Sequence, residues 1–245
     1  MSAIPIDRVL KKLDEYLDKK DFDAAEKHLR YWEADAKASR DMRGLLTVIN
    51  EQIGFYRKSC REAEAIAAAE RALKLADENG LSGTATMGTT LINAATAYKA
   101  FGQAEKALPL YEKAKEIYES ALRSDDRRLG GLYNNMALAL LDIRSFTEAE
   151  ALFNKAISVM AQIDGGQAEM AISYCNLADL YYLDGKRDVR PCLEKAFELL
   201  SAEELPRDGY YAFVCEKCAP TFAQYGYPYC ERELLKRARK IYEGA

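Results

Sequence analysis

The sequence predicts an all-α protein, an α-solenoid of about six antiparallel helix pairs. Small and aromatic residues recur about every 41 residues along the chain. Within each period, two amphipathic runs with helical spacing meet at a short turn. The chain also holds only 14 glycines and 6 prolines, which favours long helices with few breaks. Repetition of this kind indicates helical hairpins that each bury an apolar face against the next.

The pattern is most complete between residues 88 and 117. Its fixed positions are Ala95, Tyr98, Gly102, Ala107, Tyr111 and Ala114. The alanines allow two helices to cross closely, and the aromatic rings fill the space that remains between them. Gly102 stands where the chain must turn from one helix into the next.

Two sets of landmarks give the same period. The small residue that opens the second helix of a repeat stands at positions 25, 65, 107 and 149, at spacings of 40, 42 and 42. The turn glycines stand at 102, 185 and 226, which are two periods and one period apart. We therefore expect one solenoid over residues 1–245. Its predicted repeats span about 6–38, 42–79, 85–123, 126–162, 166–200 and 208–244.

Several local features refine this prediction. Asp21 is expected to cap the second helix of the first repeat. Pro191 and Pro228 are expected in first helical turns, where a missing N–H costs little, whereas Pro109 should bend its helix. Arg144 replaces glycine at the turn of the fourth repeat. In the last helix, Glu231, Leu235 and Ala238 are expected to take the core positions.

Composition limits the function classes. The formal net charge of −4 and the lack of a basic run give no reason to expect a nucleic-acid partner. No segment approaches eighteen apolar residues, and the N-terminal stretch lacks the apolar core of a signal peptide, so we expect a cytoplasmic protein without a membrane partner. In that compartment the six cysteines are expected to be reduced.

The pattern of small residue, aromatic, glycine, alanine, aromatic and alanine resembles the tetratricopeptide repeat (TPR) family. The repeats here are 40 to 42 residues long rather than the usual length of about 34, and are similar in this to kinesin light chain and to bacterial peptide-sensing TPR proteins. The resemblance implies a right-handed superhelix whose concave groove is lined by the first helix of each pair, and a protein or peptide ligand in that groove.

The resemblance also points to three asparagines. Asn93, Asn135 and Asn176 each stand two residues before the small residue of a first helix, at spacings of 42 and 41. In peptide-binding TPR proteins, asparagine at the matching position can donate to and accept from a peptide backbone. The alternative is that each asparagine only bonds a neighbouring helix.

Other predicted groove residues follow from the same family register. They are Asn50, Arg57, Lys58, Thr89, Thr96, Lys99, Asn134, Leu138, Asp142, Asp179 and Tyr182. Lys58 and Lys99 resemble basic positions that hold a carboxylate in other family members. Glu51, Asp142 and Asp179 add negative charge, which argues against a full two-carboxylate clamp. The alternative for all these charges is a solvated helix face.

Features that would support catalysis or metal binding are weak. Cys215 and Cys218 form a CxxC pair with Cys230 downstream, but zinc needs four ligands and the single histidine, His28, lies near the other end of the chain. We therefore expect the pair to pack in the core. There is no phosphate-cradling glycine loop and no triad pattern. The sequence predicts no enzyme, no catalytic residue, no metal and no cofactor.

The predicted function is a non-enzymatic adaptor that binds a peptide or protein segment in the concave groove. One alternative is a scaffold module, structural or regulatory, that self-associates into a homo-oligomer through its end repeats. A third hypothesis is a regulatory module that serves a separately encoded enzyme.

Overall fold

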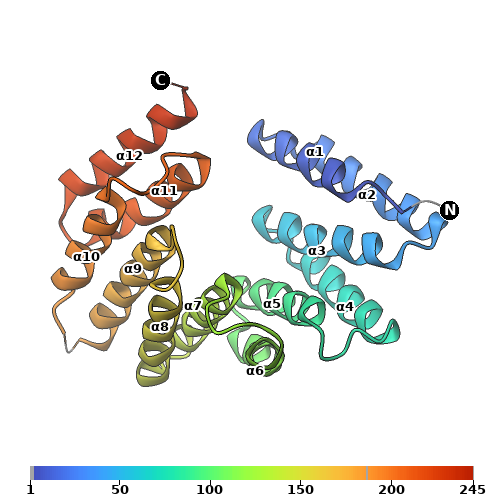
Figure 1. Cartoon of the computed structure of the whole chain (residues 1–245), viewed down its shortest axis with the longest axis horizontal. Helices are drawn as coiled ribbons and strands as arrows, with labels where there is room; N and C mark the ends of the chain where they lie inside the picture. Colours follow the sequence, from blue (N-terminus) through green and yellow to red (C-terminus); the bar gives the residue numbers. More distant parts are fainter. Residues whose placement is uncertain (1–2, 186, 245) are drawn as a thin grey trace. The chain divides into compact units, whose positions relative to one another are not determined.

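The computed structural model describes residues 3–185 and 187–244. Over these ranges the chain forms α-helices and no strand (Figure 1). The helices are α1 (Ile6–Asp18), α2 (Phe22–Ser39), α3 (Met42–Lys58), α4 (Glu62–Glu78), α5 (Ala85–Ala100), α6 (Ala104–Ala121), α7 (Arg127–Asp142), α8 (Phe146–Met160), α9 (Gln167–Asp184), α10 (Arg190–Ser201), α11 (Gly209–Gln224) and α12 (Pro228–Tyr242). The prediction of an all-α chain of helix pairs is confirmed.

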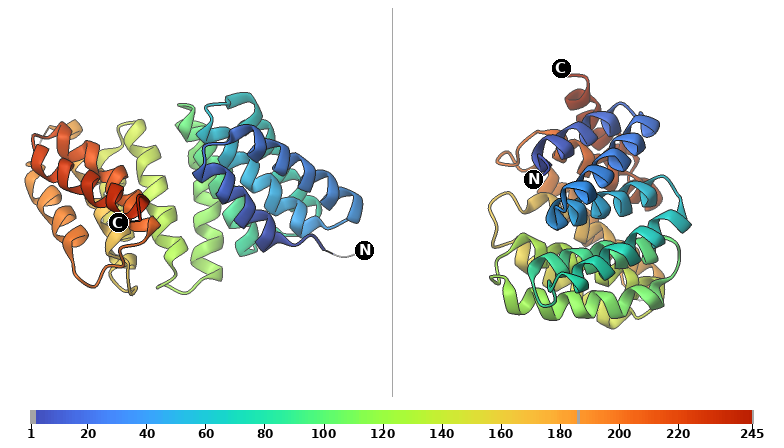
Figure 2. Two further views of the ribbon diagram at one scale, coloured as in Figure 1. Left: turned by 90° about the horizontal axis from the view of Figure 1, so that it is seen from above. Right: turned by 90° about the vertical axis from the view of Figure 1, so that its right-hand side faces the viewer.

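The helices form two compact units, Met1–Ala121 and Leu122–Ala245. Over the described residues each unit contains three helical hairpins, and the two helices of every hairpin contact each other. The left view of Figure 2 shows helices of the N-terminal unit lying side by side. We call the odd-numbered helices the first helices and the even-numbered ones the second helices. Besides the contacts within hairpins, α3 contacts α5 in the N-terminal unit, and α9 contacts both α7 and α11 in the C-terminal unit.

The turns within hairpins require one residue in the left-handed region. Gly102 and Gly226 occupy it with φ of 74° and 85°. Cys60 and Arg144 do so as well, with φ of 56° and 60°, although a side chain makes this conformation unfavourable. The prediction that Arg144 stands at a turn is therefore confirmed. Asp21 caps α2 as predicted, since its Oδ1 accepts from the Ala24 N–H at 3.1 Å.

The core of the N-terminal unit depends on small side chains. Four alanines on α4, namely Ala65, Ala69, Ala72 and Ala76, have no exposed surface, which lets the neighbouring helices approach closely. Gly88 on α5 serves the same purpose, because a Cβ there would lie 2.4 Å from the ring of Tyr118 on α6.

The core of the C-terminal unit corrects one expectation. Leu234 of α12 is fully buried, whereas Leu235 is 38% exposed and Glu231 is only half-buried. The predicted core position at Leu235 is therefore wrong by one residue. Leu234 and Ala238 are four residues apart and share the inward face of the helix, while Leu235 is turned about 100° away from it.

The prolines fall at two kinds of position. Pro191 lies in the first turn of α10 and Pro228 begins α12, as predicted. Pro109 lies inside α6, which continues through it, and Pro220 lies inside α11. No helix in the described part combines enough length with enough apolar character to span a bilayer.

Candidate functional site

A hydrogen-bonded clasp joins the first helices α3 and α5. The Asn93 amide nitrogen donates to Asn50 Oδ1 at 2.8 Å, and the Asn50 amide nitrogen lies 3.2 Å from Thr90 Oγ1. The same Asn50 nitrogen lies 3.0 Å from the carbonyl oxygen of Leu46 on its own helix. Asn93 thus bonds a residue that stands 43 positions earlier in the sequence.

An equivalent clasp joins α7 and α9 in the C-terminal unit. The Asn176 amide nitrogen donates to Asn134 Oδ1 at 2.9 Å, and Ser173 Oγ donates to the same oxygen at 3.2 Å. Asn134, Ser173 and Asn176 stand 83 or 84 residues after the three clasp residues of the N-terminal unit. Two of the three predicted asparagines therefore use one side-chain amide hydrogen to brace consecutive first helices.

Asn135 differs from the other two asparagines. It is half-buried on α7, and no side-chain hydrogen bond to it is found in the described part of the chain. The Asn135 amide is left available for another partner.

A hollow of about 630 Å³ lies beside the clasp of the N-terminal unit. Its lining comes from α3, α5 and the segment that joins α4 to α5, and comprises Arg43, Leu46, Thr47, Asn50, Glu51, Leu81, Thr84, Thr86, Thr89 and Asn93. Burial raises the pKa of the Glu51 carboxyl, the negative charge of Asp14 adds to the shift, and Lys58 opposes it. Because the charged form of Glu51 is poorly solvated, this hollow favours a ligand that supplies hydrogen-bond donors or positive charge.

A second hollow, of about 390 Å³, opens between α7, α9 and α11. Asp179, Tyr182 and Tyr225 line it together with Leu141, Asp142, Arg144, Phe146, Leu183 and Gln224. Tyr225 Oη donates to Asp179 Oδ1 at 2.8 Å, and the rings of Tyr182 and Tyr225 lie 5.2 Å apart. Burial raises the pKa of the Asp179 carboxyl. Two predicted groove residues, Asp179 and Tyr182, thus line the same hollow.

The remaining predicted residues lie in less distinctive surroundings. Thr96 Oγ1 lies 3.0 Å from the hydroxyl of Tyr111 on the paired second helix α6. Leu138 is half-buried against the core of the C-terminal unit, and Lys99 is half-buried near the end of α5. Lys58 is exposed and faces the charge of Glu51. These four side chains stay predictions as ligand contacts.

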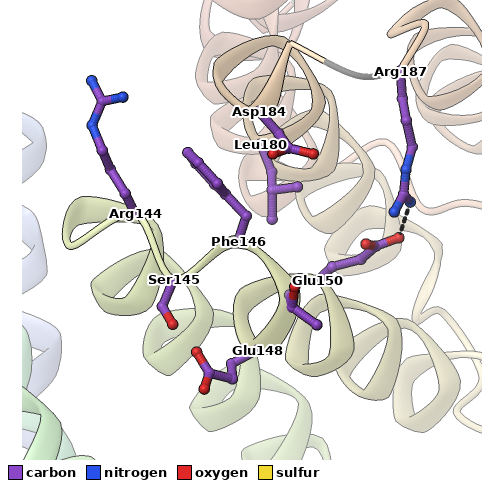
Figure 3. A pocket seen from close by; sticks show the side chains of 9 residues that line it. Arg144, Ser145, Phe146, Glu148, Glu150, Leu180, Asp184 and Arg187 are labelled. Atoms are coloured by element: carbon purple, nitrogen blue, oxygen red, sulfur yellow. Dashed lines mark hydrogen bonds and ion pairs between the residues drawn. The ribbon is translucent and has the colours of Figure 1, made fainter.

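A glutamate–tyrosine–arginine cluster that joins neighbouring hairpins was not predicted from the sequence. In the C-terminal unit, Glu150 accepts from Tyr181 Oη and pairs with Arg187, whose guanidinium lies over the Tyr181 ring. Figure 3 shows Arg187 reaching toward Glu150 beside a further hollow of about 390 Å³. In the N-terminal unit, Glu26, Tyr56 and Arg61 repeat the arrangement. The signal was a glutamate directly after the small residue at 25 and at 149.

The cysteines and the histidine have structural surroundings. Cys215 and Cys218 are fully buried on α11, as the packing interpretation predicts. Within the described ranges, no cluster of three potential metal ligands is found. His28 Nε2 lies 2.9 Å from the carbonyl oxygen of Val9, and its ring contacts Tyr16 and Trp32.

The hairpins and their period agree with a known family model. The model described as tetratricopeptide repeat matches residues 45–120 and 128–202, together more than half of the chain. The chain belongs to the tetratricopeptide repeat family. The TPR resemblance predicted from the repeats is thereby confirmed. No protein of curated function matches the sequence significantly.

Three solved structures illustrate the similarity of fold. The TPR-like repeats assigned to a kinesin light chain of Podosopora anserina match with a TM-score of 0.59 at 20% identity, over 80% of this chain and 94% of that chain. BtubC (BKLC) from P. vanneervenii matches with a TM-score of 0.61 at 19% identity, over 93% and 91%. NprR in complex with its cognate peptide NprX matches with a TM-score of 0.61 at 16% identity, over 97% and 68%.

Proposed function

We propose that this TPR protein is a non-enzymatic adaptor that holds a peptide segment of a partner protein against its first helices. The observation that carries the proposal is the hollow of about 630 Å³ between α3 and α5. Glu51 lies in it half-buried, and no hydrogen bond or ion pair to its carboxylate is found in the described part of the chain. A carboxylate withdrawn from water without a partner costs free energy that a bound ligand can recover.

The asparagines supply the hydrogen-bonding groups that an extended peptide needs. A peptide backbone offers one donor and one acceptor per residue, and an asparagine amide can match both. The amide of Asn135 is not used by the clasps, and the clasps leave the Oδ1 atoms of Asn93 and Asn176 as acceptors. Asn135 and Asn176, both of the C-terminal unit, stand 41 residues apart in equivalent positions of consecutive repeats, so they suit a ligand that is itself periodic.

The solved structures add support from similarity of fold. NprR has been solved in complex with its cognate peptide, and this chain matches that structure over 97% of its own length. A stack of helical hairpins offers the same kind of surface in every repeat, which suits a linear segment better than a compact small molecule.

A peptide-library selection against the full chain tests the proposal. For the strongest selected peptide, Asn135→Ala should weaken binding about 5- to 10-fold, the loss expected for a backbone hydrogen bond to a well-placed amide. Asn154→Ala is the matched control, since Asn154 is exposed on the second helix of the same hairpin. Equal affinities for wild type and Asn135→Ala would contradict a role for Asn135. The selection of no peptide at all would contradict the adaptor itself.

Self-association is the second candidate function, because α12 exposes large apolar side chains. Tyr229 and Tyr242 are 68% and 54% exposed, and Leu235 is also exposed. Exposed apolar side chains on a helix can pair with another copy of the chain. A dimer that forms with rising concentration and is lost in Leu235→Asp would favour this function, particularly if no peptide is selected.

A further inference from the structure

We propose that the hollow around Asp179, Tyr182 and Tyr225 is a subsite for a positively charged side chain, lysine or arginine, of the bound peptide. The inference rests on the proposed function, and it assigns the chemistry of one residue of the ligand. All side chains that form this subsite belong to the C-terminal unit.

Asp179 is held as an acceptor with an unused oxygen. The Gln224 amide nitrogen donates to Tyr225 Oη at 2.9 Å, so the single hydroxyl proton of Tyr225 is directed to Asp179 Oδ1. Over the described residues, Asp179 Oδ2 has no hydrogen-bond partner. Burial disfavours the charged carboxylate and raises its pKa. A cation that enters the hollow would restore the solvation that this carboxylate lacks.

Two aromatic rings stand next to this carboxylate. The rings of Tyr182 and Tyr225 are tilted at 55° with centroids 5.2 Å apart, and Tyr182 is 61% exposed although it is a large side chain. The face of a tyrosine ring attracts cations, and it also packs against the methylene groups of lysine and arginine. A carboxylate and two aromatic rings together are therefore suited to a long cationic side chain.

The other charged groups favour a cation over an anion. Asp142 adds a second carboxyl group to the lining, and Arg144 is the cationic residue among the lining residues. Arg144 is exposed at the hairpin turn. Asp179 is the half-buried carboxylate of this lining, so an acidic ligand side chain placed beside it would be repelled.

Small capped amino acids test the subsite without knowledge of the natural peptide. The probes are N-acetylarginine N-methylamide and its citrulline counterpart, which keeps the shape of arginine and lacks its charge. In NMR titrations of the full chain, we expect the arginine probe to shift the backbone signals of Leu183, Gln224 and Tyr225. The citrulline probe and N-acetylglutamate N-methylamide should leave them unchanged. Equal shifts with arginine and citrulline would overturn the proposal.

Two variants and a control locate the binding. Asp179→Asn should weaken the arginine probe roughly tenfold or more, because it removes the charge and keeps an acceptor for Tyr225. Tyr182→Leu should weaken it about 3- to 10-fold through loss of the cation–π contact. Asp164→Asn removes the same charge from an exposed position between α8 and α9 and should have no effect. A comparable loss in Asp164→Asn would show that net charge alone attracts the probe.

The failure of this inference can be told apart from the failure of the proposed function. If the peptide library yields ligands whose affinity is unchanged by Asp179→Asn and that lack basic residues, the adaptor stands and the subsite is refuted. If the library yields no ligand, the adaptor is refuted whatever the small probes show.

Discussion

The side-chain amide of Asn93 on α5 donates to the side-chain oxygen of Asn50 on α3 at a distance of 2.8 Å. This bond joins two consecutive repeats, and Asn176 and Asn134 form the same bond 83 and 84 residues later. Asn135 takes part in neither bond, and no side-chain hydrogen bond to it is found among the described residues. The three predicted asparagines therefore divide into two braces and one free amide.

The clasp predicts that Asn93 and Asn135 contribute differently to the stability of the protein. Asn93→Ala should lower the free energy of unfolding by about 1–2 kcal/mol, because it removes a half-buried hydrogen bond and leaves Asn50 Oδ1 without its donor. Asn135→Ala should change it by less than about 0.5 kcal/mol. Urea unfolding followed by circular dichroism measures both. A double-mutant cycle over Asn50 and Asn93 that gives no coupling energy would contradict the clasp.

The raised pKa of Asp179 predicts how stability changes with pH. In the folded chain the proton is held more tightly than at the ordinary value of 3.8, so the unfolding free energy falls as pH rises from 3.8 through the raised folded pKa. Asp179→Asn should therefore be more stable than wild type at pH 7, and the difference should disappear below about pH 3.8. Burial is the larger cause of the raised pKa, and the hydrogen bond from Tyr225 opposes it because it favours the charged carboxylate.

Thermal unfolding at a series of pH values measures this difference. If the wild type is the more stable protein at pH 7, the desolvation of Asp179 is not the dominant effect. If Asp179→Asn is more stable than wild type and no longer binds the arginine probe, Asp179 serves binding at the expense of folding stability.

Two glycines of the N-terminal unit predict opposite responses to the same substitution. Gly88→Ala places a Cβ 2.4 Å from the buried ring of Tyr118, and overpacking of this kind should destabilise the protein by about 1–2 kcal/mol after the gain in helix propensity. Gly54→Ala lies inside α3 with no atom within 4 Å of its Cβ, so it should stabilise by up to about 1 kcal/mol. Chemical denaturation compares the two variants, and effects of equal sign would refute the packing explanation.

The sequence by itself determined the repeats, because packing between the helices of a hairpin is encoded locally. Ala95, Gly102 and Ala107 must be small or permissive wherever two helices cross or turn, so they recur and can be read from one chain. The same logic gave the position of Arg144 at a turn. The prediction of the core residue in α12 was wrong by one position, at Leu235. Leu234 and Leu235 are both apolar, so the sequence does not tell which of them faces inward, and contact with the rest of the unit buries Leu234.

Only the tertiary structure decided which polar groups are used within the fold. Asn93, Asn135 and Asn176 occupy the same position of the pattern. Asn93 and Asn176 bond partners that lie 43 and 42 residues earlier, and the identity of such a partner is independent of the local pattern. Likewise, Tyr225 stands 46 residues from Asp179 and meets it only because α9 packs against α11. Hydrogen bonding and desolvation depend on such distant neighbours, whereas helix formation depends on near ones.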